Sequence, residues 1–292
     1  MHVDRYAPSP TADLHLGNLR TAFAGWLLAR HAGGRWLLRV EDLDRARVRA
    51  ADGAEARNLD DLRRLGLDWD GPVVRQSDRE DRYRDAIATL GDRLYECFCT
   101  RREIAAATSA PHGDDGFRPY PGTCLRLTAA EREERRARRR PALRVRADAA
   151  TVTVHDRFAG TVTGVVDDFV LRRGDGEYSY NLASVVDDVA QGVTVITRGD
   201  DLLSSAPRQA WLTSQLGGTP PEYAHVSLVM GDDGRRLAKR NGTATLDELG
   251  GPERVVPRIT ASLGLGPCRD AAEALARMPA DYGFWTSRRS IT

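Results

Sequence analysis

The segment from Arg5 to Asn18, RYAPSPTADLHLGN, most constrains what this chain can fold into. Pro8 and Pro10 lack the backbone N–H that a strand or helix interior needs, so they end the short strand that begins the segment. Gly17 carries no side chain that would keep a phosphate away from the backbone. Apolar residues recur at spacings of three and four after Leu16, which predicts an amphipathic helix. Its first free amides favour an anion, so the segment predicts a nucleotide site.

A second strand is predicted soon after this helix. A Gly-Gly pair breaks the helix after about Arg30, and the run Arg35–Val40 has the composition of a strand. Strand, helix and parallel strand form a Rossmann-type crossover, in which ligands bind at the carboxyl ends of the strands. Residues 7–9 and the pair Glu41-Asp42 would both emerge at that edge. No GxGxxG motif accompanies the turn, which disfavours a dinucleotide oxidoreductase.

Three of the four cysteines are close in sequence. Cys97 and Cys99 share a Cys-x-Cys motif, and Cys124 follows a loop rich in Gly, Pro and Asp. In a reducing compartment a metal explains such a cluster better than disulfides do, because zinc takes four ligands and binds thiolates. From the residues alone, His112 in the same loop is the more ordinary fourth ligand. Three buried cysteines without a metal are the alternative, and Cys268 is expected to be an ordinary apolar residue.

A further pair of elements is expected near the middle of the chain. A helix begins within residues 178–188, and residues 193–201 read as a strand that ends in charged residues. Arg198 could pair with a carboxylate in bidentate fashion, and Tyr180 could donate a hydrogen bond to it, although each alone is more often structural. Asp187 and Asp188 point in different directions on a helix, so we do not expect them to hold magnesium together.

Composition and charge agree with a soluble enzyme. The chain has 292 residues, of which 41% are apolar, and a net charge of +1, which argues against a uniformly basic nucleic-acid coat but permits a local patch. Residues 131–140 are predicted to form a solvated helix held by the pairs Glu131–Arg135 and Glu134–Arg138, with RNA contact as the alternative. No membrane span or signal peptide is apparent, so we expect a cytoplasmic protein.

The only lysine of the chain, Lys239, lies in a polar segment bounded by glycines, residues 232–242. This segment follows an expected strand over residues 226–230, and such a loop can close over a ligand. An ordinary surface loop, in a chain that prefers arginine to lysine, is the alternative interpretation.

Together these motifs resemble those of class I aminoacyl-tRNA synthetases, and the glutamyl members match best. The sequence His15-Leu16-Gly17-Asn18 is similar to their HIGH signature, and residues 236–240 are similar to a degenerate KMSKS loop. The runs Arg5–Ser9 and Arg39–Asp44 are similar to two parts of the glutamate pocket. The resemblance covers about residues 5–242. It implies an α/β fold with a Rossmann-type doubly wound parallel sheet, an inserted zinc-containing subdomain and a short helical C-terminal segment.

The resemblance also implies a reaction and residues to perform it. Glutamate and ATP would give glutamyl-adenylate, with Mg²⁺ as the expected companion of ATP, and the glutamyl group would then pass to RNA. His15 and Lys239 would be catalytic, and Glu41 would bind the ammonium group of glutamate. The implied glutamate-binding residues are Arg5, Tyr6, Ala7, Pro8, Ser9, Glu41, Tyr180 and Arg198. The implied ATP-binding residues are His15, Gly17, Asn18, Arg236 and Lys239.

One group of truncated relatives, the glutamyl-queuosine tRNA(Asp) synthetases, carries a Cys-x-Cys, Tyr-x-x-x-Cys zinc pattern. Here that pattern corresponds to Cys97, Cys99, Tyr120 and Cys124, which replaces His112 by Tyr120 as the implied ligand of one structural zinc. About fifty residues follow Gly242, too few for the helical anticodon-binding half of a full glutamyl enzyme. The implied acceptor is therefore queuosine in the anticodon of tRNA(Asp), and we expect a monomer.

Three alternatives remain: a truncated synthetase that charges tRNA(Glu), a noncatalytic tRNA-binding paralogue, and an unrelated nucleotidyltransferase. The expected division of the chain has four parts. Residues 1–92 would form the first half of the catalytic core and residues 93–145 the inserted zinc-binding subdomain. Residues 146–242 would form the second half of the core with the KMSKS-like loop, and residues 243–292 the C-terminal segment.

Overall fold

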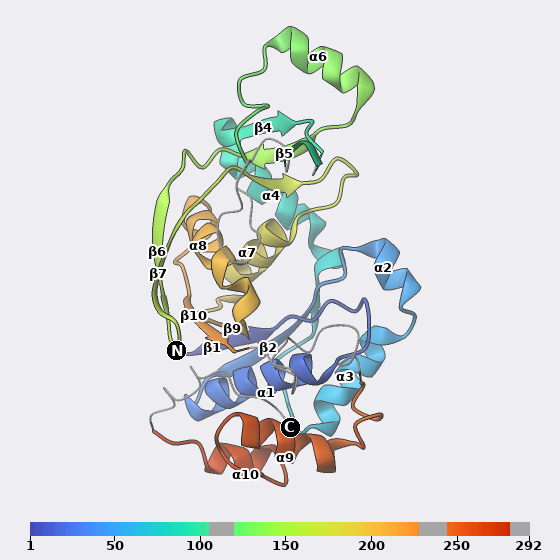
Figure 1. Cartoon of the computed structure of the whole chain (residues 1–292), viewed down its shortest axis with the longest axis vertical. Helices are drawn as coiled ribbons and strands as arrows, with labels where there is room; N and C mark the ends of the chain where they lie inside the picture. Colours follow the sequence, from blue (N-terminus) through green and yellow to red (C-terminus); the bar gives the residue numbers. More distant parts are fainter. Residues whose placement is uncertain (101, 105–119, 228–243, 281–292) are drawn as a thin grey trace.

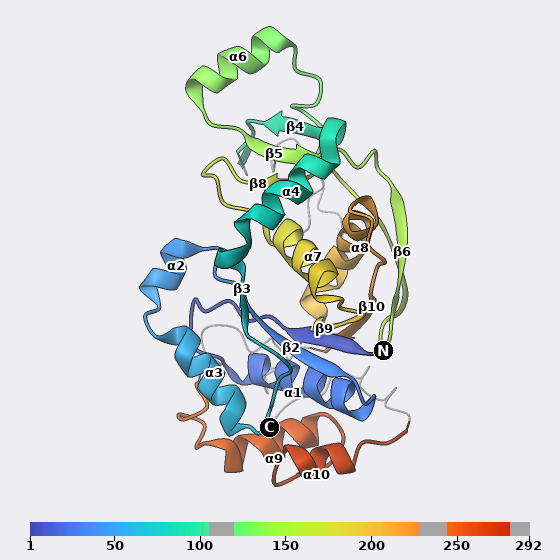
Figure 2. The ribbon, with the colours of Figure 1, turned by 180° about the vertical axis from the view of Figure 1, so that it is seen from behind.

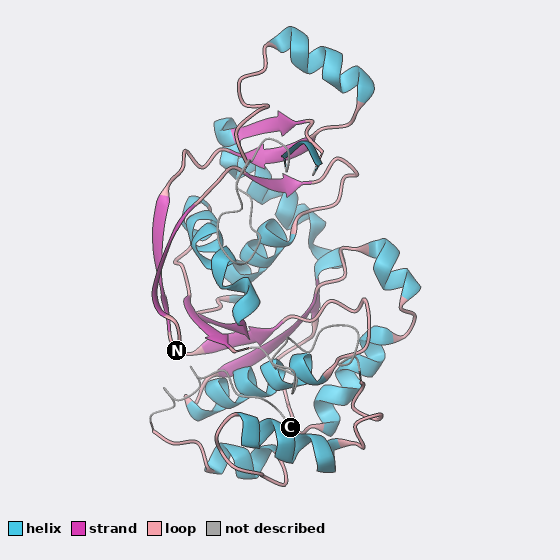
Figure 3. Cartoon of the chain, in the orientation of Figure 1, coloured by secondary structure: helices cyan, strands magenta, loops and turns pink. Residues whose placement is uncertain are grey.

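The computed structural model of the chain describes residues 1–100, 102–104, 120–227 and 244–280. These residues form an elongated molecule in which a central layer of strands and helices separates two smaller ends (Figure 1). One end is a pair of C-terminal helices, and the other is a small sheet from which one helix projects. Figure 3 shows the strands β1 (Val3–Tyr6), β2 (Arg35–Val40) and β9 (Val195–Gly199) of the central layer with helices on both sides of them.

The first half of the central layer is parallel. Its strands are β1 (Val3–Tyr6), β2 (Arg35–Val40) and β3 (Val74–Arg75), in the order β1-β2-β3. The helix α1 (Leu16–His31) connects β1 to β2, so the predicted crossover is confirmed. After β2 the chain forms α2 (Arg45–Ala50), α3 (Ala54–Arg64), η1 (Gln76–Arg79), α4 (Glu80–Leu90) and η2 (Gly91–Arg93).

The helix α1 is more deeply buried than an amphipathic helix would be. It packs against β1, β2 and β9 on one side and against the C-terminal helices α9 (Pro252–Ser262) and α10 (Ala271–Ala276) on the other. Figure 2 shows these two helices beneath α1. Since both sides are covered, side chains such as Leu19, Phe23 and Leu28 are inaccessible although they lie on different faces.

The second half of the central layer is a mixed sheet, with the order β7-β6-β10-β9. The strands β6, β10 and β9 are parallel and β7 is antiparallel to β6, so the predicted all-parallel sheet is correct only in part. Of the expected strand over residues 226–230, Val226 is the last residue of β10, and residues 228–230 lie outside the described residues. The elements are β6 (Thr151–Asp156), β7 (Gly160–Val165), α7 (Tyr180–Gln191), β9 (Val195–Gly199), η3 (Asp200–Ser205), α8 (Ala206–Gln215) and β10 (Glu222–Val226).

The small sheet at the far end is antiparallel. Its strands are β4 (Leu94–Cys97), β5 (Ala142–Val145) and β8 (Phe169–Arg172), in the order β4-β5-β8. Its third strand thus comes from beyond residue 145, where we expected the inserted subdomain to end. The projecting helix α6 (Ala129–Arg138) starts two residues earlier than predicted, because Thr128 and Glu131 form a capping box. The predicted Glu134–Arg138 ion pair is present at 2.6 Å.

None of the helices in the described ranges is both long and apolar enough to cross a membrane.

Asp4 joins the two halves of the central layer. The amide of Thr197 on β9 donates to Asp4 Oδ1 at 3.1 Å, and the amide of Arg5 donates to the same oxygen at 2.7 Å. A backbone bond from Thr194 N to Val3 O, at 2.9 Å, lies beside them. Asp4 is fully buried, and burial raises its pKa to about 6 although the charge of Arg5 and hydrogen bonds from Thr197 oppose the shift.

We predict that the substitution D4N makes the protein more stable than the wild type above pH 6.5. The pKa of Asp4 is higher in the folded than in the unfolded protein, so its contribution to stability is present below about pH 4 and is lost as the pH rises through about 6. A neutral amide has no such dependence and can still accept both backbone hydrogen bonds. Melting temperatures of D4N and of the exposed control D60N, measured from pH 5 to 8, test this. A constant difference between D4N and wild type would contradict it.

Candidate active site

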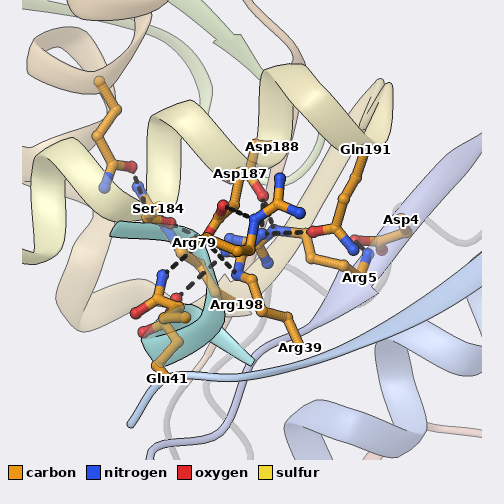
Figure 4. Close-up of polar contacts among 12 residues, drawn as sticks. Asp4, Arg5, Arg39, Glu41, Arg79, Ser184, Asp187, Asp188, Gln191 and Arg198 are labelled. Atoms are coloured by element: carbon orange, nitrogen blue, oxygen red, sulfur yellow. Dashed lines mark hydrogen bonds and ion pairs between the residues drawn. The ribbon is translucent and has the colours of Figure 1, made fainter. Parts of the chain in front are cut away.

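Two neighbouring carboxylates on α7, Asp187 and Asp188, bind the charged residues that β1, β2 and η1 direct towards this helix (Figure 4). Asp188 Oδ1 accepts from Arg5 Nε at 2.9 Å and from Arg39 Nη1 at 2.6 Å. Asp187 faces other elements and accepts from Tyr83 Oη at 2.8 Å and from Gln76 Nε2 at 3.0 Å, as well as from Arg79. Each carboxylate therefore neutralises arginines of the protein, and the two face different elements.

Arg39, the first residue of the run Arg39–Asp44, is a central member of this network, although the sequence analysis assigned no role to its side chain. Its side chain is inaccessible to solvent and donates to Asp188, to Gln191 Oε1 at 3.0 Å and to Ser184 Oγ at 3.2 Å. It also donates to Glu41 Oε1 at 3.2 Å, which holds that carboxylate at the end of β2. The sequence signals for Arg39 were its place at the start of that run and a charged residue near the end of an otherwise apolar strand.

The side chain of Glu41 is 9% exposed and lies beside two cations. Burial raises its pKa, although the charges of Arg39 and Arg5 oppose the shift. The backbone amide of Glu41 donates to Pro8 O at 3.0 Å, so the ends of β1 and β2 are joined as the crossover predicts. Glu41, Ser9 and Tyr180 line one cavity of about 990 Å³, which brings together three of the predicted glutamate-binding residues.

Arg198, at the end of β9, is a buried cation of a different kind. It donates from Nη1 to Tyr180 Oη at 3.2 Å and to Gln209 Oε1 at 2.6 Å, and from Nη2 to Leu202 O at 3.1 Å. Within the described part of the chain, no carboxylate lies within ion-pair distance of its guanidinium. A buried charge without a counterion is costly, so this position favours an anionic ligand.

Three other residues predicted to bind glutamate lie on β1 and in the turn that follows it. Tyr6 belongs to the core: its ring stacks on Trp36 with centroids 6.1 Å apart, and its hydroxyl donates to Asn18 O at 3.3 Å. Ala7 and Pro8 continue the chain from it towards Ser9 and are half-buried. The structure therefore places Tyr6 as support for the turn that precedes α1.

His15 caps α1 with its own side chain. Its Nδ1 accepts from Gly17 N at 3.1 Å and from Asn18 N at 3.4 Å, while Asn18 Oδ1 accepts from His15 N at 3.3 Å. The prediction that the first amides are free for an anion is therefore wrong for these two. A Cβ atom on Gly17 would lie 3.0 Å from His15 Cε1, so the glycine makes room for the imidazole. Arg236 and Lys239 lie outside the described residues.

The three clustered cysteines meet at Tyr120 in the small sheet. Their ligand atoms lie within 4.8 Å of one another, and this set could hold a metal ion. Tyr120 Oη is 3.4 Å from Cys97 Sγ and 3.7 Å from Cys99 Sγ, and it accepts from Cys124 N at 2.8 Å. The three sulfur atoms and the phenol oxygen could serve as the four ligands of a tetrahedral metal site. His112 lies outside the described residues.

Comparison with known proteins identifies the family. The model of the class I tRNA synthetases (E and Q), catalytic domain, matches residues 2–270. This chain belongs to that family. It is therefore a ligase of the class I synthetase type, as the motifs at residues 5–18 and 39–44 indicate.

Two curated relatives are similar over most of this chain. A glutamyl-Q tRNA(Asp) synthetase of Nocardia farcinica is 57% identical over 93% of this chain and 88% of its own length. One of Cutibacterium acnes is 55% identical over 92% of this chain and 78% of its own length. A glutamate tRNA ligase from Elizabethkingia meningosepticum, crystallised with its amino acid, is 25% identical with a TM-score of 0.78. That match covers 97% of this chain but only 65% of the ligase, so this chain spans about two thirds of the ligase.

We predict that D188N destabilises the protein by about 3 kcal/mol or more, because it leaves Arg5 and Arg39 buried without their shared anion. The control is D85N, at an exposed position on α4, for which we expect a change below about 0.5 kcal/mol. Urea unfolding at pH 7 measures both. If D188N unfolded at the same urea concentration as D85N, Asp188 would not have the organising role described above.

Proposed function

We propose that this protein activates L-glutamate with ATP and transfers the glutamyl group to queuosine in the anticodon of tRNA(Asp). The observation that carries the proposal is the charge pattern of the site. Arg198 is a buried cation without a counterion among the described residues, and the carboxylate Glu41 lines the adjacent cavity beside Tyr180. An acidic amino acid offers the complementary charges, an ammonium group and carboxylates. The names of the two curated relatives support the choice of acceptor.

In the proposed complex each charged group of glutamate has a partner. Glu41 binds the ammonium group, and Arg198 with Tyr180 binds a carboxylate. Arg198 donates to the Tyr180 oxygen, so the hydroxyl proton of Tyr180 remains available to a ligand. Arg5 uses Nε for Asp188, and within the described residues its Nη groups donate no hydrogen bond, so they supply a second cationic contact. Ser9 completes this end of the cavity.

The first step joins the α-carboxylate oxygen of glutamate to the α-phosphorus of ATP and releases pyrophosphate. In the second step a hydroxyl of the modified base attacks the acyl carbon, and AMP leaves with the electrons of the broken acyl–oxygen bond. We assign the ATP phosphates to His15, Gly17, Asn18, Arg236 and Lys239, with Mg²⁺ bound to ATP. The cations Arg236 and Lys239 would stabilise the charge that develops on the leaving pyrophosphate.

The far part of the cavity supports an RNA acceptor. The whole cavity, at about 990 Å³, is several times what a glutamate molecule fills, and its lining also includes Cys97 and Cys99. The arginines that line this part are Arg139, Arg140, Arg144 and Arg173. Clustered arginines are the side chains that neutralise RNA phosphates. Because tRNA and ATP meet in the cytoplasm, we expect the protein to act there. We also expect it to act as a monomer.

We also propose that the cysteine cluster holds one structural Zn²⁺, bound by Cys97, Cys99, Cys124 and Tyr120. The donor set supports zinc, which prefers thiolates in a four-coordinate site. The amide of Phe98 donates to Cys124 Sγ at 3.3 Å. This bond and the contact with Tyr120 lower the pKa of Cys124 although burial opposes the shift, whereas burial raises the pKa of Cys99 to about 12.

The proposed function predicts ATP-dependent transfer of labelled glutamate to queuosine-bearing tRNA(Asp), but not to the same tRNA without queuosine. The matched variants are E41Q, which removes the proposed ammonium contact, and K239A, which removes the proposed phosphate contact. We expect each to lower transfer at least about tenfold. Labelling of tRNA(Glu) instead would make the protein a shortened glutamyl enzyme, and tRNA binding without any labelling would indicate a noncatalytic paralogue.

The zinc proposal predicts one Zn²⁺ per chain by atomic emission after purification without added metal. C124S should lose the metal, whereas the control C268S should keep it, because Cys268 lies in a different core cluster, the one around α1. Comparison of Y120F with H112A then identifies the fourth ligand, since only the true ligand should weaken zinc retention against a chelator. Full zinc content in C124S would contradict this assignment.

A further inference from the structure

Three polar residues form a row across neighbouring strands of the second half-sheet. The order β6-β10-β9 places Asp156, His225 and Arg198 side by side, and His225 is directly opposite Arg198 in the register of β10 and β9. The side chains of Asp156 and His225 have no exposed surface, and Arg198 is 5% exposed. None of the motifs singled out in the sequence includes Asp156 or His225.

The hydrogen bonds of this row fix the state of His225. Arg198 can only donate, so its bond from Nε to His225 Nε2, at 2.9 Å, requires an unprotonated Nε2. His225 Nδ1 therefore carries the proton and donates it to Asp156 Oδ2 at 2.6 Å. Burial lowers the pKa of His225, and the charge of Arg198 adds to this effect while Asp156 opposes it. The imidazole is thus neutral and has one defined tautomer.

Asp156 is held firmly enough to anchor the row. Its Oδ1 accepts from Phe158 N at 2.9 Å and from Ala159 N at 2.7 Å, and its Oδ2 also accepts from His225 N at 3.0 Å. Although burial alone would raise its pKa, the bonds from His225 and from the two amides lower the pKa of Asp156 to about 2. It therefore stays ionised and accepting at every pH at which the protein would be assayed.

We propose that Asp156 and His225 are positioning residues that orient Arg198 for the carboxylate of the amino-acid substrate. This inference rests on the proposed glutamate-binding role of Arg198. Gln209 and Leu202 hold the Nη groups, and His225 holds Nε, so the plane of the guanidinium is defined from three sides.

The choice of histidine matters for electrostatics. A carboxylate at this position would orient Arg198 equally well, but it would cancel the charge that attracts the substrate. Neutral imidazole supplies a directed acceptor and leaves the positive charge of Arg198 for the ligand. The ionised Asp156 acts one residue further away, where its charge is separated from Arg198 by the imidazole.

Two substitutions at one position separate orientation from packing. In H225Q the side-chain oxygen can reach the place of Nε2 and accept from Arg198, whereas in H225N the shorter amide can reach only the place of Nδ1 and bonds to Asp156. We expect H225N to raise the KM for glutamate roughly tenfold to a hundredfold, and H225Q to restore most of this loss. The KM for ATP should stay within about twofold in both.

The measurement is glutamate-dependent exchange of pyrophosphate into ATP, with and without tRNA(Asp), together with calorimetric titration of glutamate into each protein. The control is H155N, which removes an exposed histidine of β6. D156N is a second variant: its amide would donate to Nδ1 and shift the proton to Nε2, against Arg198, so we expect the same selective rise in the KM for glutamate. Melting curves show whether each variant is folded.

The outcomes are distinct. An equal KM for glutamate in H225N and H225Q, or parallel rises in the KM values for glutamate and ATP, would overturn the positioning role while leaving the proposed function intact. A folded wild-type protein that neither exchanges with nor binds glutamate would overturn the proposed function and this inference with it. A selective defect in H225N and D156N, restored in H225Q, supports the positioning role.

Discussion

The shared ion pairs of Asp188 with Arg5 and Arg39 are the interaction on which the rest of the site depends. They connect α7 to β1 and to β2, while the neighbouring Asp187 connects the same helix to η1 and α4 through Arg79 and Tyr83. Each arginine alone would be too costly to bury between the sheet and α7. Because one carboxylate serves two guanidinium groups, the strands that carry Arg5 and Arg39 are held at a fixed separation from α7.

This arrangement explains why one cation can remain unneutralised. Arg5, Arg39 and Arg79 are each paired with an aspartate of α7, so the net charge of the buried network stays small. Arg198 is oriented instead by neutral acceptors, namely His225, Gln209 and the carbonyl of Leu202. The protein thereby separates cations that stabilise the fold from one that is left for a ligand, which is a condition for selective recognition of an anion.

The local elements around the site could be predicted because they depend on short-range signals. The helix over residues 16–31 and the strand Arg35–Val40 follow from periodicity and the glycines between them. The proximity of the motif at residues 5–9 to Glu41 could also be predicted, because that crossover joins the two segments that carry them. The partners of Asp187 and Asp188 could not be found in this way, because Tyr83 and Arg5 lie 104 and 183 residues away. The cap formed by His15 was missed because imidazole is an uncommon N-cap.

The helix α8 connects the two ends of the cavity. Gln209 on this helix accepts from Arg198, and the adjacent Arg208 pairs with Asp167, which also accepts from Tyr120 N at 3.0 Å. Tyr120 is the residue around which the cysteines gather. A displacement of the cysteine cluster would therefore act through Asp167 on the same helix that orients the arginine at the amino-acid end. In a two-step reaction this connection would hold the acceptor end and the amino-acid end of the cavity at a fixed position relative to each other.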